Sequence, residues 1–259
     1  MTEAQLAPIS PVTVAADLNF ADLRGALAAG WRDFLAHPLY GLFFGAIYVA
    51  AGLALTWALT ARGGSGLLLT AAAGFPLIAP FTAVGLYEIS RRRAAGLPLS
   101  WGAVLGALRG RGDDQLLMIG GFIFVGFTFW IILAHGIFAI FLAESGIGSE
   151  SLEIFRTSAG LAMLAVGGGI GAVVAYVFYA VTVISLPMLV DRDVDFLTAI
   201  IKSLRCVQAN GTVMLTWAAI IAAALFAAML PGFAGLLVVL PVLGHATFHL
   251  YRRVCGKPL

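Results

Sequence analysis

Long apolar blocks, separated by short polar stretches, run along most of the chain. A helix that crosses a hydrocarbon core about 30 Å thick needs about 20 such residues. Six blocks reach that length, at about 39–60, 67–90, 116–143, 158–190, 212–230 and 232–251. The pattern predicts an all-α, polytopic membrane protein with six transmembrane helices in a single membrane domain, residues 20–259.

Shorter stretches with apolar residues at helical spacing precede three of these blocks, at 20–34, 101–109 and 196–207. Such amphipathic helices lie at a membrane surface. Residues 1–19 are weakly patterned, and we expect a flexible N-terminal tail there. In the first stretch we expect one apolar face, formed by Phe20, Leu23, Leu27, Trp31 and Phe34. The charged residues Asp22, Arg24, Arg32 and Asp33 lie elsewhere around the helix.

Each amphipathic stretch is followed by a polar break and two spans, which indicates three repeats of an amphipathic helix plus a transmembrane hairpin. Two spans share a frame, because Pro80 precedes Arg91 by the same eleven residues that separate Pro241 from Arg252. The fourth span has only Pro187 near its end. Any protein with an even number of spans and amphipathic linkers would look similar, so a true repeat and a chance likeness both stay open.

Composition agrees with a membrane protein, since 61% of the 259 residues are hydrophobic and 11% are charged, against roughly 25% charged in an ordinary globular domain. Thirteen of the 15 Lys and Arg residues fall on the face that holds both termini and the two long loops. The positive-inside rule therefore predicts that both termini are cytoplasmic. The excess of Arg over Lys, 13 to 2, is typical of a GC-rich bacterial genome, so we expect the protein in the bacterial cytoplasmic (inner) membrane. We expect no nucleic-acid partner.

Candidate ligands lie in the last span, where His245 and His249 are four residues apart on one helical face. That spacing could serve a metal, a haem or a proton relay, with Glu88 joining them if the second and sixth spans are neighbours. Alternatively, both histidines are packing residues near the membrane interface. For Glu88, a pairing with Arg91 or Arg92, three and four residues on, is the better interpretation.

Other residues at the two matching span ends are candidates for anchoring at the interface. Tyr87 precedes the first arginine by four residues and joins the candidate polar site, and the basic anchors are Arg91, Arg92, Arg93, Arg252 and Arg253. Cys206 and Cys255 form no zinc pattern, and a disulfide is not expected on the cytoplasmic side.

Catalytic patterns are not recognisable in this sequence. Asp191, Asp193 and Asp195 lack the glycine and glutamate of a calcium loop and fit helix capping better. Gly167 to Gly171 lie inside a span, where glycines permit close helix packing. We therefore expect no enzyme and no cofactor.

Three motifs resemble the DUF2189 family of predicted bacterial integral membrane proteins. They are Gly85–Arg92 (GLYEISRR), Ser185–Asp191 (SLPMLVD) with 199–210 after it, and Gly244–Arg252 (GHATFHLYR). The resemblance extends over nearly the whole chain from about Phe20. It implies an uncharacterised membrane protein; some members are labelled as cytochrome c oxidase subunits, but four histidines cannot supply a six-histidine haem-copper set.

The favoured hypothesis is a non-catalytic accessory, assembly or interaction protein, for example of a respiratory complex. Its partners would be membrane lipids and another membrane protein or a second copy of the chain. One alternative is a small transporter or channel, which would need discontinuous helices and polar residues at the bilayer midplane. Another is a haem- or metal-binding membrane protein that uses His245 and His249.

Overall fold

The computed structural model describes residues 13–61, 83–107, 115–143 and 156–256. Regular structure in these ranges is helical throughout, which confirms the predicted all-α class. The helices are α1 (Phe20–Ala36), α2 (Pro38–Ala61), α5 (Val84–Ala94), α6 (Trp101–Gly106), α7 (Gln115–Leu142), α8 (Ser158–Thr182), α9 (Ser185–Asp191), α10 (Phe196–Ala209), α11 (Gly211–Met229) and α12 (Leu236–Val254).

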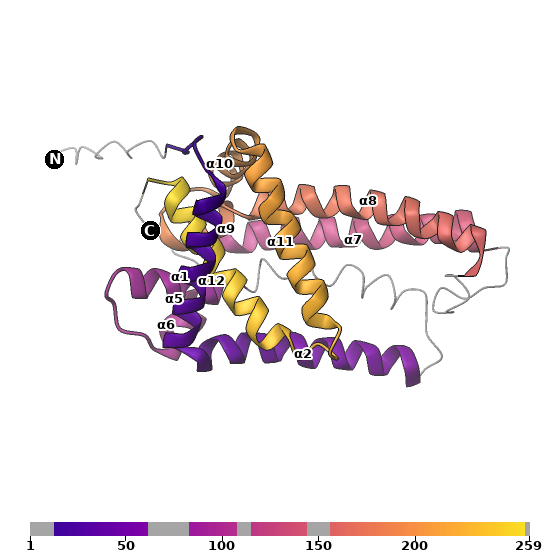
Figure 1. Ribbon diagram of the computed structural model, residues 1–259, viewed down its shortest axis with the longest axis horizontal. Coiled ribbons are helices and arrows are strands. Elements are labelled where there is room, and N and C mark those ends of the chain that lie inside the picture. Colours follow the sequence, from indigo (N-terminus) through magenta and orange to yellow (C-terminus); the bar gives the residue numbers. More distant parts are fainter. Residues whose placement is uncertain (1–12, 62–82, 108–114, 144–155, 257–259) are drawn as a thin grey trace, which may run out of the picture.

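Long and short helices occupy different parts of the molecule (Figure 1). Helices α2, α7 and α8 run along its longest axis, and α11 and α12 cross it obliquely. The shorter helices α1, α5, α6, α9 and α10 gather at one end, which we call the junction end. Helix α1 stands across the direction of the long helices there, as expected for a helix that lies in the plane of a membrane surface.

Four helices of the described part are long and apolar enough to cross a membrane: Pro38–Trp57, Gly120–Leu142, Ser158–Asp191 and Gly211–Met229. They coincide with the first, third, fourth and fifth predicted spans. Most of the second predicted span lies outside the described residues. Helix α12 occupies the sixth, but two histidines and two arginines reduce its hydropathy. The chain is thus an integral membrane protein with several apolar helices, and the count of six stays a prediction.

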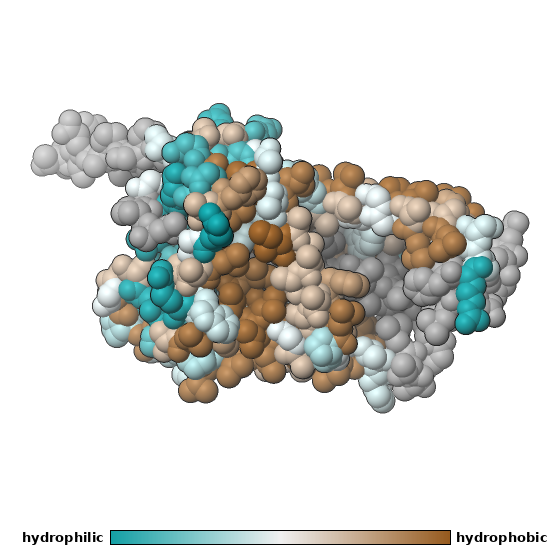
Figure 2. Space-filling view, viewed as in Figure 1, coloured by the Kyte–Doolittle hydropathy of each residue, from teal (hydrophilic) through white to brown (hydrophobic). Residues whose placement is uncertain are grey.

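The surface follows the same division (Figure 2). Hydrophilic residues concentrate over the junction end, and hydrophobic residues cover much of the visible face of the long helices. Large apolar side chains are exposed on α2, α7 and α8, including Trp57, Phe124, Ile132, Ile140 and Val173. A soluble monomer rarely exposes so extended an apolar surface, whereas lipid covers it without cost.

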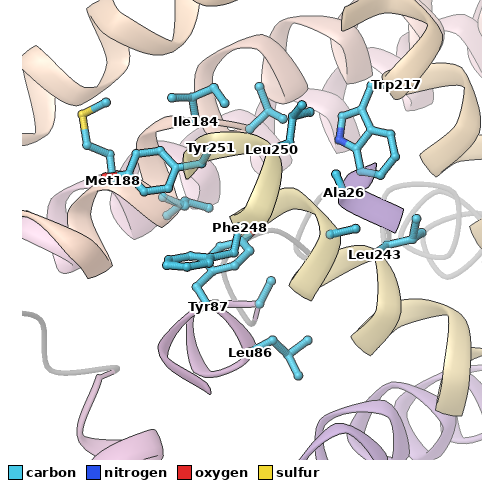
Figure 3. Packing of buried hydrophobic residues seen from close by; sticks show 14 of the residues in the cluster. Ala26, Leu86, Tyr87, Ile184, Met188, Trp217, Leu243, Phe248, Leu250 and Tyr251 are labelled. Carbon is cyan, nitrogen blue, oxygen red and sulfur yellow. The ribbon is translucent and has the colours of Figure 1, made fainter. Parts of the chain in front are cut away.

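The hydrophobic core lies at the junction end and is centred on α12 (Figure 3). Phe248, Leu250 and Tyr251 of α12 are fully buried there. Helices α1, α2, α5, α9 and α11 all pack against α12. Helix α12, predicted as the sixth span, is therefore the internal support of the molecule.

Helix α1 packs on α12 through small residues, which the sequence did not predict. Ala26, Ala29 and Gly30 are buried, whereas Phe20 and Trp31, two residues of the predicted apolar face, are 52% and 45% exposed. A Cβ added to Gly30 would lie 2.6 Å from the backbone oxygen of Val242 and from the backbone nitrogen of Ala246. Helices this close can only meet through small side chains. Asp33 shares this face and is buried too, which its charge alone did not indicate.

The fourth span is interrupted close to Pro187. Helix α8 ends at Thr182, and α9 begins at Ser185, two residues before Pro187. The Ser203 hydroxyl of α10 lies in this break, where it donates to the Ala180 carbonyl at 2.7 Å and accepts from the Ile184 amide at 3.2 Å. One side chain from the next helix thereby replaces the backbone bond that a continuous helix would make between residues 180 and 184.

Residues 13–19, expected as part of the flexible tail, are attached to the helices. The Ala15 amide donates to the Val254 carbonyl at 2.9 Å. The Asn210 side chain accepts from the Leu18 amide at 3.0 Å and donates to the Ala15 carbonyl at 2.8 Å. The ordered chain therefore begins before α1, while residues 1–12 of the predicted tail lie outside the described residues.

Candidate functional site

Five polar side chains from three helices meet inside the junction end, and we call them the polar junction. Helix α1 contributes Asp33, α5 contributes Ser90 and Arg93, and α12 contributes His245 and His249. Asp33, Ser90, His245 and His249 are all buried. Helices α5 and α12 are neighbours, as the metal-site alternative required, but the carboxylate that reaches the histidines is Asp33 and not Glu88.

The Asp33 carboxylate is the centre of the polar junction. Its Oδ2 accepts from the Ser90 hydroxyl at 2.5 Å and from His249 Nε2 at 2.8 Å, and its Oδ1 lies 3.2 Å from Arg93 Nε. Ser90 Oγ in turn lies 2.8 Å from His245 Nδ1. Both histidines thus reach the same carboxylate oxygen, one directly and the other through Ser90.

The hydrogen bonds assign the positions of the ring protons. An ionised carboxylate only accepts, so His249 must carry a proton on Nε2. The Ser90 hydroxyl has a single proton, which it gives to Asp33; His245 Nδ1 must then be the donor to Ser90 Oγ. This assignment follows from the network rather than from visible hydrogens. It leaves His245 Nε2 and His249 Nδ1 as the nitrogens that can take up a further proton.

Electrostatics favour the ionised form of Asp33. Burial by itself would raise the pKa of this carboxyl, but hydrogen bonds from His249 and Ser90, with the nearby His249 and His245 rings, outweigh burial and lower its pKa. The Arg93 guanidinium balances the charge. A buried ion pair of this kind tolerates the loss of neither partner.

Glu88 belongs to a separate ion cluster on α5. Its carboxylate binds Arg91 through two bonds of 2.6 Å, and Arg92 approaches it at 3.3 Å. These are the predicted partners at positions three and four further along the helix. The charge of Glu88 is therefore neutralised within its own helix, and the carboxylate that contacts the histidines is Asp33.

The other residues singled out from the sequence have separate places in the fold. Tyr87 is buried in the hydrophobic core near Phe248 (Figure 3). Arg253 pairs with Asp22 at 3.0 Å and with Asp17 at 3.2 Å, so this basic anchor binds protein. The Asp195 side chain accepts from the Thr198 amide at 2.8 Å, which confirms the predicted helix cap.

Comparison with known proteins adds one assignment. Residues 67–191 match a family described as "Predicted integral membrane protein (DUF2189)". This region, slightly less than half of the chain, is similar to that family. It contains the Gly85–Arg92 and Ser185–Asp191 motifs, whereas Gly244–Arg252 lies beyond the matched residues. Neither the curated proteins nor the solved structures gave a match.

The DUF2189 motifs meet each other and the third motif at the junction end. Ser90 of the first motif bonds to His245 of the third. Tyr251 of the third donates to Asp191 of the second at 2.9 Å and accepts from Arg192 at 3.1 Å. Helices α5, α9 and α12 thus join through polar contacts.

Metal binding gains no support from this geometry. No group of three His, Cys, Asp or Glu residues in the described part of the chain is arranged to hold a metal ion. One nitrogen of each ring is engaged within the polar junction. Asp33 was missed from the sequence, although its spacing from Ala26, Ala29 and Gly30 on one helical face was a usable signal.

Proposed function

We propose that this chain is a non-catalytic membrane protein of the bacterial cytoplasmic membrane that acts by packing against another membrane protein. An accessory or assembly role, for example in a respiratory complex, fits this description. The proposed topology has six spans, both termini in the cytoplasm and the polar junction at the cytoplasmic interface.

The observation that carries this proposal is the closure of the polar junction. Asp33 accepts from Ser90 and His249 and pairs with Arg93, all within the chain. The buried side chains of the junction bind one another and join three helices, which is the role of a structural contact. What the chain offers to other molecules is apolar surface on the long helices, where Gly168 and Gly169 of α8 have no described atom within 4 Å of their Cβ positions.

The break between α8 and α9 does not favour the transporter alternative. Helix α8 has 25 residues, which is about 37 Å at 1.5 Å per residue. That exceeds a hydrocarbon core of about 30 Å, so in the proposed topology the break lies at the cytoplasmic edge. The backbone groups freed there are bound by Ser203. Transporter sites instead use unwound helices near the midplane.

Co-purification tests the proposal. The tagged chain is extracted from its native membrane in mild detergent, and its absorption spectrum, metal content and bound proteins are recorded. We expect a colourless, metal-free preparation with a stoichiometric membrane-protein partner. A preparation with a haem or metal spectrum would support the cofactor alternative. A colourless preparation without any partner would contradict the proposal and favour the transporter alternative.

A matched pair of variants sharpens this test. Gly168→Leu should reduce recovery of the partner, since its side chain enters open space on α8. Gly102→Leu on α6 is the control, because its Cβ position is equally open in the described structure but lies outside the spans. Equal loss of partner with both variants would contradict packing on α8.

Topology is tested separately by thiol labelling in intact cells. Leu97→Cys is exposed beside α6 at the junction end, and Ala143→Cys is exposed at the far end of α7. An impermeant maleimide should label only the second. Labelling of the first would place the junction end outside the cell and overturn the proposed orientation.

A further inference from the structure

Helices α1 and α10 dock on their neighbours in the same way. Gly30 of α1 lies against the oxygen of Val242 and the nitrogen of Ala246. Ser203 of α10 bonds to the oxygen of Ala180 and the nitrogen of Ile184. Both positions therefore face a carbonyl and the amide four residues later on the partner helix. The helix ends correspond too, since the His37 amide bonds to the Asp33 carbonyl and the Asn210 amide to the Cys206 carbonyl.

This correspondence supports the proposed repeat and pairs the residues of the two docking sites. Asp33 corresponds to Cys206, which is fully buried. His245 corresponds to Val183 and His249 to Pro187, both buried. The frame that the second and sixth spans share pairs His245 with Val84, another buried valine. A surface helix can thus dock on a span in this fold with an apolar contact set.

The polar junction is for this reason not required by packing. Replacing buried polar and charged groups by apolar groups of similar size is often neutral or stabilising. Yet the α1 site holds a carboxylate, a hydroxyl, a guanidinium and two imidazoles, of which Asp33, Ser90, His245 and His249 are buried. Groups that cost stability without being needed for docking point to a role of their own.

The number of protons in the junction is the quantity that can vary. Asp33 and Arg93 carry opposite charges and cancel. The two rings are neutral in the assignment above, and each has one nitrogen that bonds to neither Asp33 nor Ser90. A first added proton forms an imidazolium that faces the Asp33 carboxylate, directly from His249 or through Ser90 from His245. A second would place two imidazolium ions and Arg93 around one carboxylate, and their repulsion opposes it.

We propose that the polar junction is a binding site for one proton, shared among His249, Asp33 and His245. Proton movement along it balances without another reactant. When His245 is the cation, its Nδ1–H bond breaks as a bond to Ser90 Oγ forms, and the Ser90 proton passes to Asp33 Oδ2. Both Asp33 and His245 are then neutral, with the His245 proton on Nε2. The titratable and charged groups that face one another are Asp33 of α1, Arg93 of α5, and His245 and His249 of α12.

Entry of the proton follows from exposure at the surface of the junction. The Arg93 side chain is 29% exposed and the His249 side chain 11%, whereas His245 is fully buried. His249 is consequently the first imidazole that solvent can reach. Ser90 and Asp33 connect it to His245, deeper in the core.

Nitrogen NMR of ring-labelled histidine tests this proposal on the full chain in lipid nanodiscs. The chain has four histidines, and His37→Gln and His135→Gln identify the two outside the junction. Between about pH 4 and 8, we expect the two junction rings together to take up one proton. Asp33→Asn should lower the midpoint of that uptake by at least one pH unit, a tenfold loss of proton affinity.

His245→Val is the matched variant, because valine occupies both corresponding positions. It should still take up one proton, because the direct contact between the other ring and Asp33 remains. The proposal is overturned if both junction rings stay neutral across the range, or if each becomes cationic with a midpoint that Asp33→Asn leaves unchanged. Should Asp33→Asn fail to fold, the native spectrum alone decides, since uptake of zero or two protons contradicts a one-proton site.

Discussion

Gly30→Ala is the sharpest test of the contact between α1 and α12. The added methyl would lie 2.6 Å from Val242 O and Ala246 N and 2.9 Å from Ala246 Cα. These are backbone atoms, so no rotamer change relieves the clash, and α1 must move outward. Overpacking of this kind costs about 1–3 kcal/mol, while alanine in place of glycine inside a helix returns about 1 kcal/mol. Backbone atoms cannot move aside as a side chain can, so the overpacking cost is taken as about 2–3 kcal/mol. We expect a net loss of about 1–2 kcal/mol, or roughly 2–8 °C in Tm for a chain of this size.

The two native cysteines provide the assay. Cys206 and Cys255 are buried, and burial raises the pKa of the Cys206 thiol to about 12, so a fluorogenic maleimide reacts with Cys206 only when the fold opens. Melting is followed in detergent at one fixed scan rate, since such unfolding is a rate. Gly102→Ala is the control, because its methyl meets no described atom within 4 Å. Equal melting of wild type and Gly30→Ala would refute the close approach of α1 to α12.

Three further changes probe the contacts around the junction end. Ser203→Ala leaves the Ile184 amide buried without its partner and should cost about 1–3 kcal/mol, with faster hydrogen exchange at Ile184; unchanged exchange would contradict the bridge. Asp33→Asn should lower Tm at neutral pH, by the equivalent of about 3–5 kcal/mol for a broken buried pair. The Asp33 pKa is lowered from 3.8, so its stabilisation is complete above about pH 4 and is lost as pH falls through the lower folded value; a Tm difference from Asp33→Asn that persists at pH 2 would be inconsistent with this. Asn210→Leu removes the bonds to Ala15 and Leu18, and limited proteolysis should then cleave the segment before α1 faster than in wild type.

Element positions were largely predictable from the sequence. Helix α1 begins at Phe20 and α10 at Phe196, as predicted, because apolar periodicity and the caps at Asn19 and Asp195 are local signals. The breaks at His37 and Asn210 are local for the same reason. The four helices that could cross a membrane were predictable from length and hydropathy, which a lipid environment imposes on any helix that crosses it.

Local sequence patterns did not predict which face of α1 is buried against α12. Ranking positions by hydrophobicity favoured Phe20 and Trp31, but close helix contact selects small residues, so Gly30 faces α12. The same approach buries Asp33, whose partner His249 is 216 residues away in sequence. A local pattern does not contain such a pairing. The histidines were recognised as a pair, and the carboxylate between them required the fold.

Closure of the molecule by α12 has a consequence for how the chain is made. Asp33 leaves the ribosome 216 residues before His249, which at about 5–20 residues per second is an interval of roughly 10–40 s. During that time α1 has no α12 to pack on and can only rest on the membrane surface, where its exposed Phe20 and Trp31 suit the lipid boundary. A chain truncated before α12 would keep its apolar spans yet leave Asp33 without its histidine partner. Membrane quality control would thus encounter one distinctive feature in unfinished copies: a surface helix that has not docked.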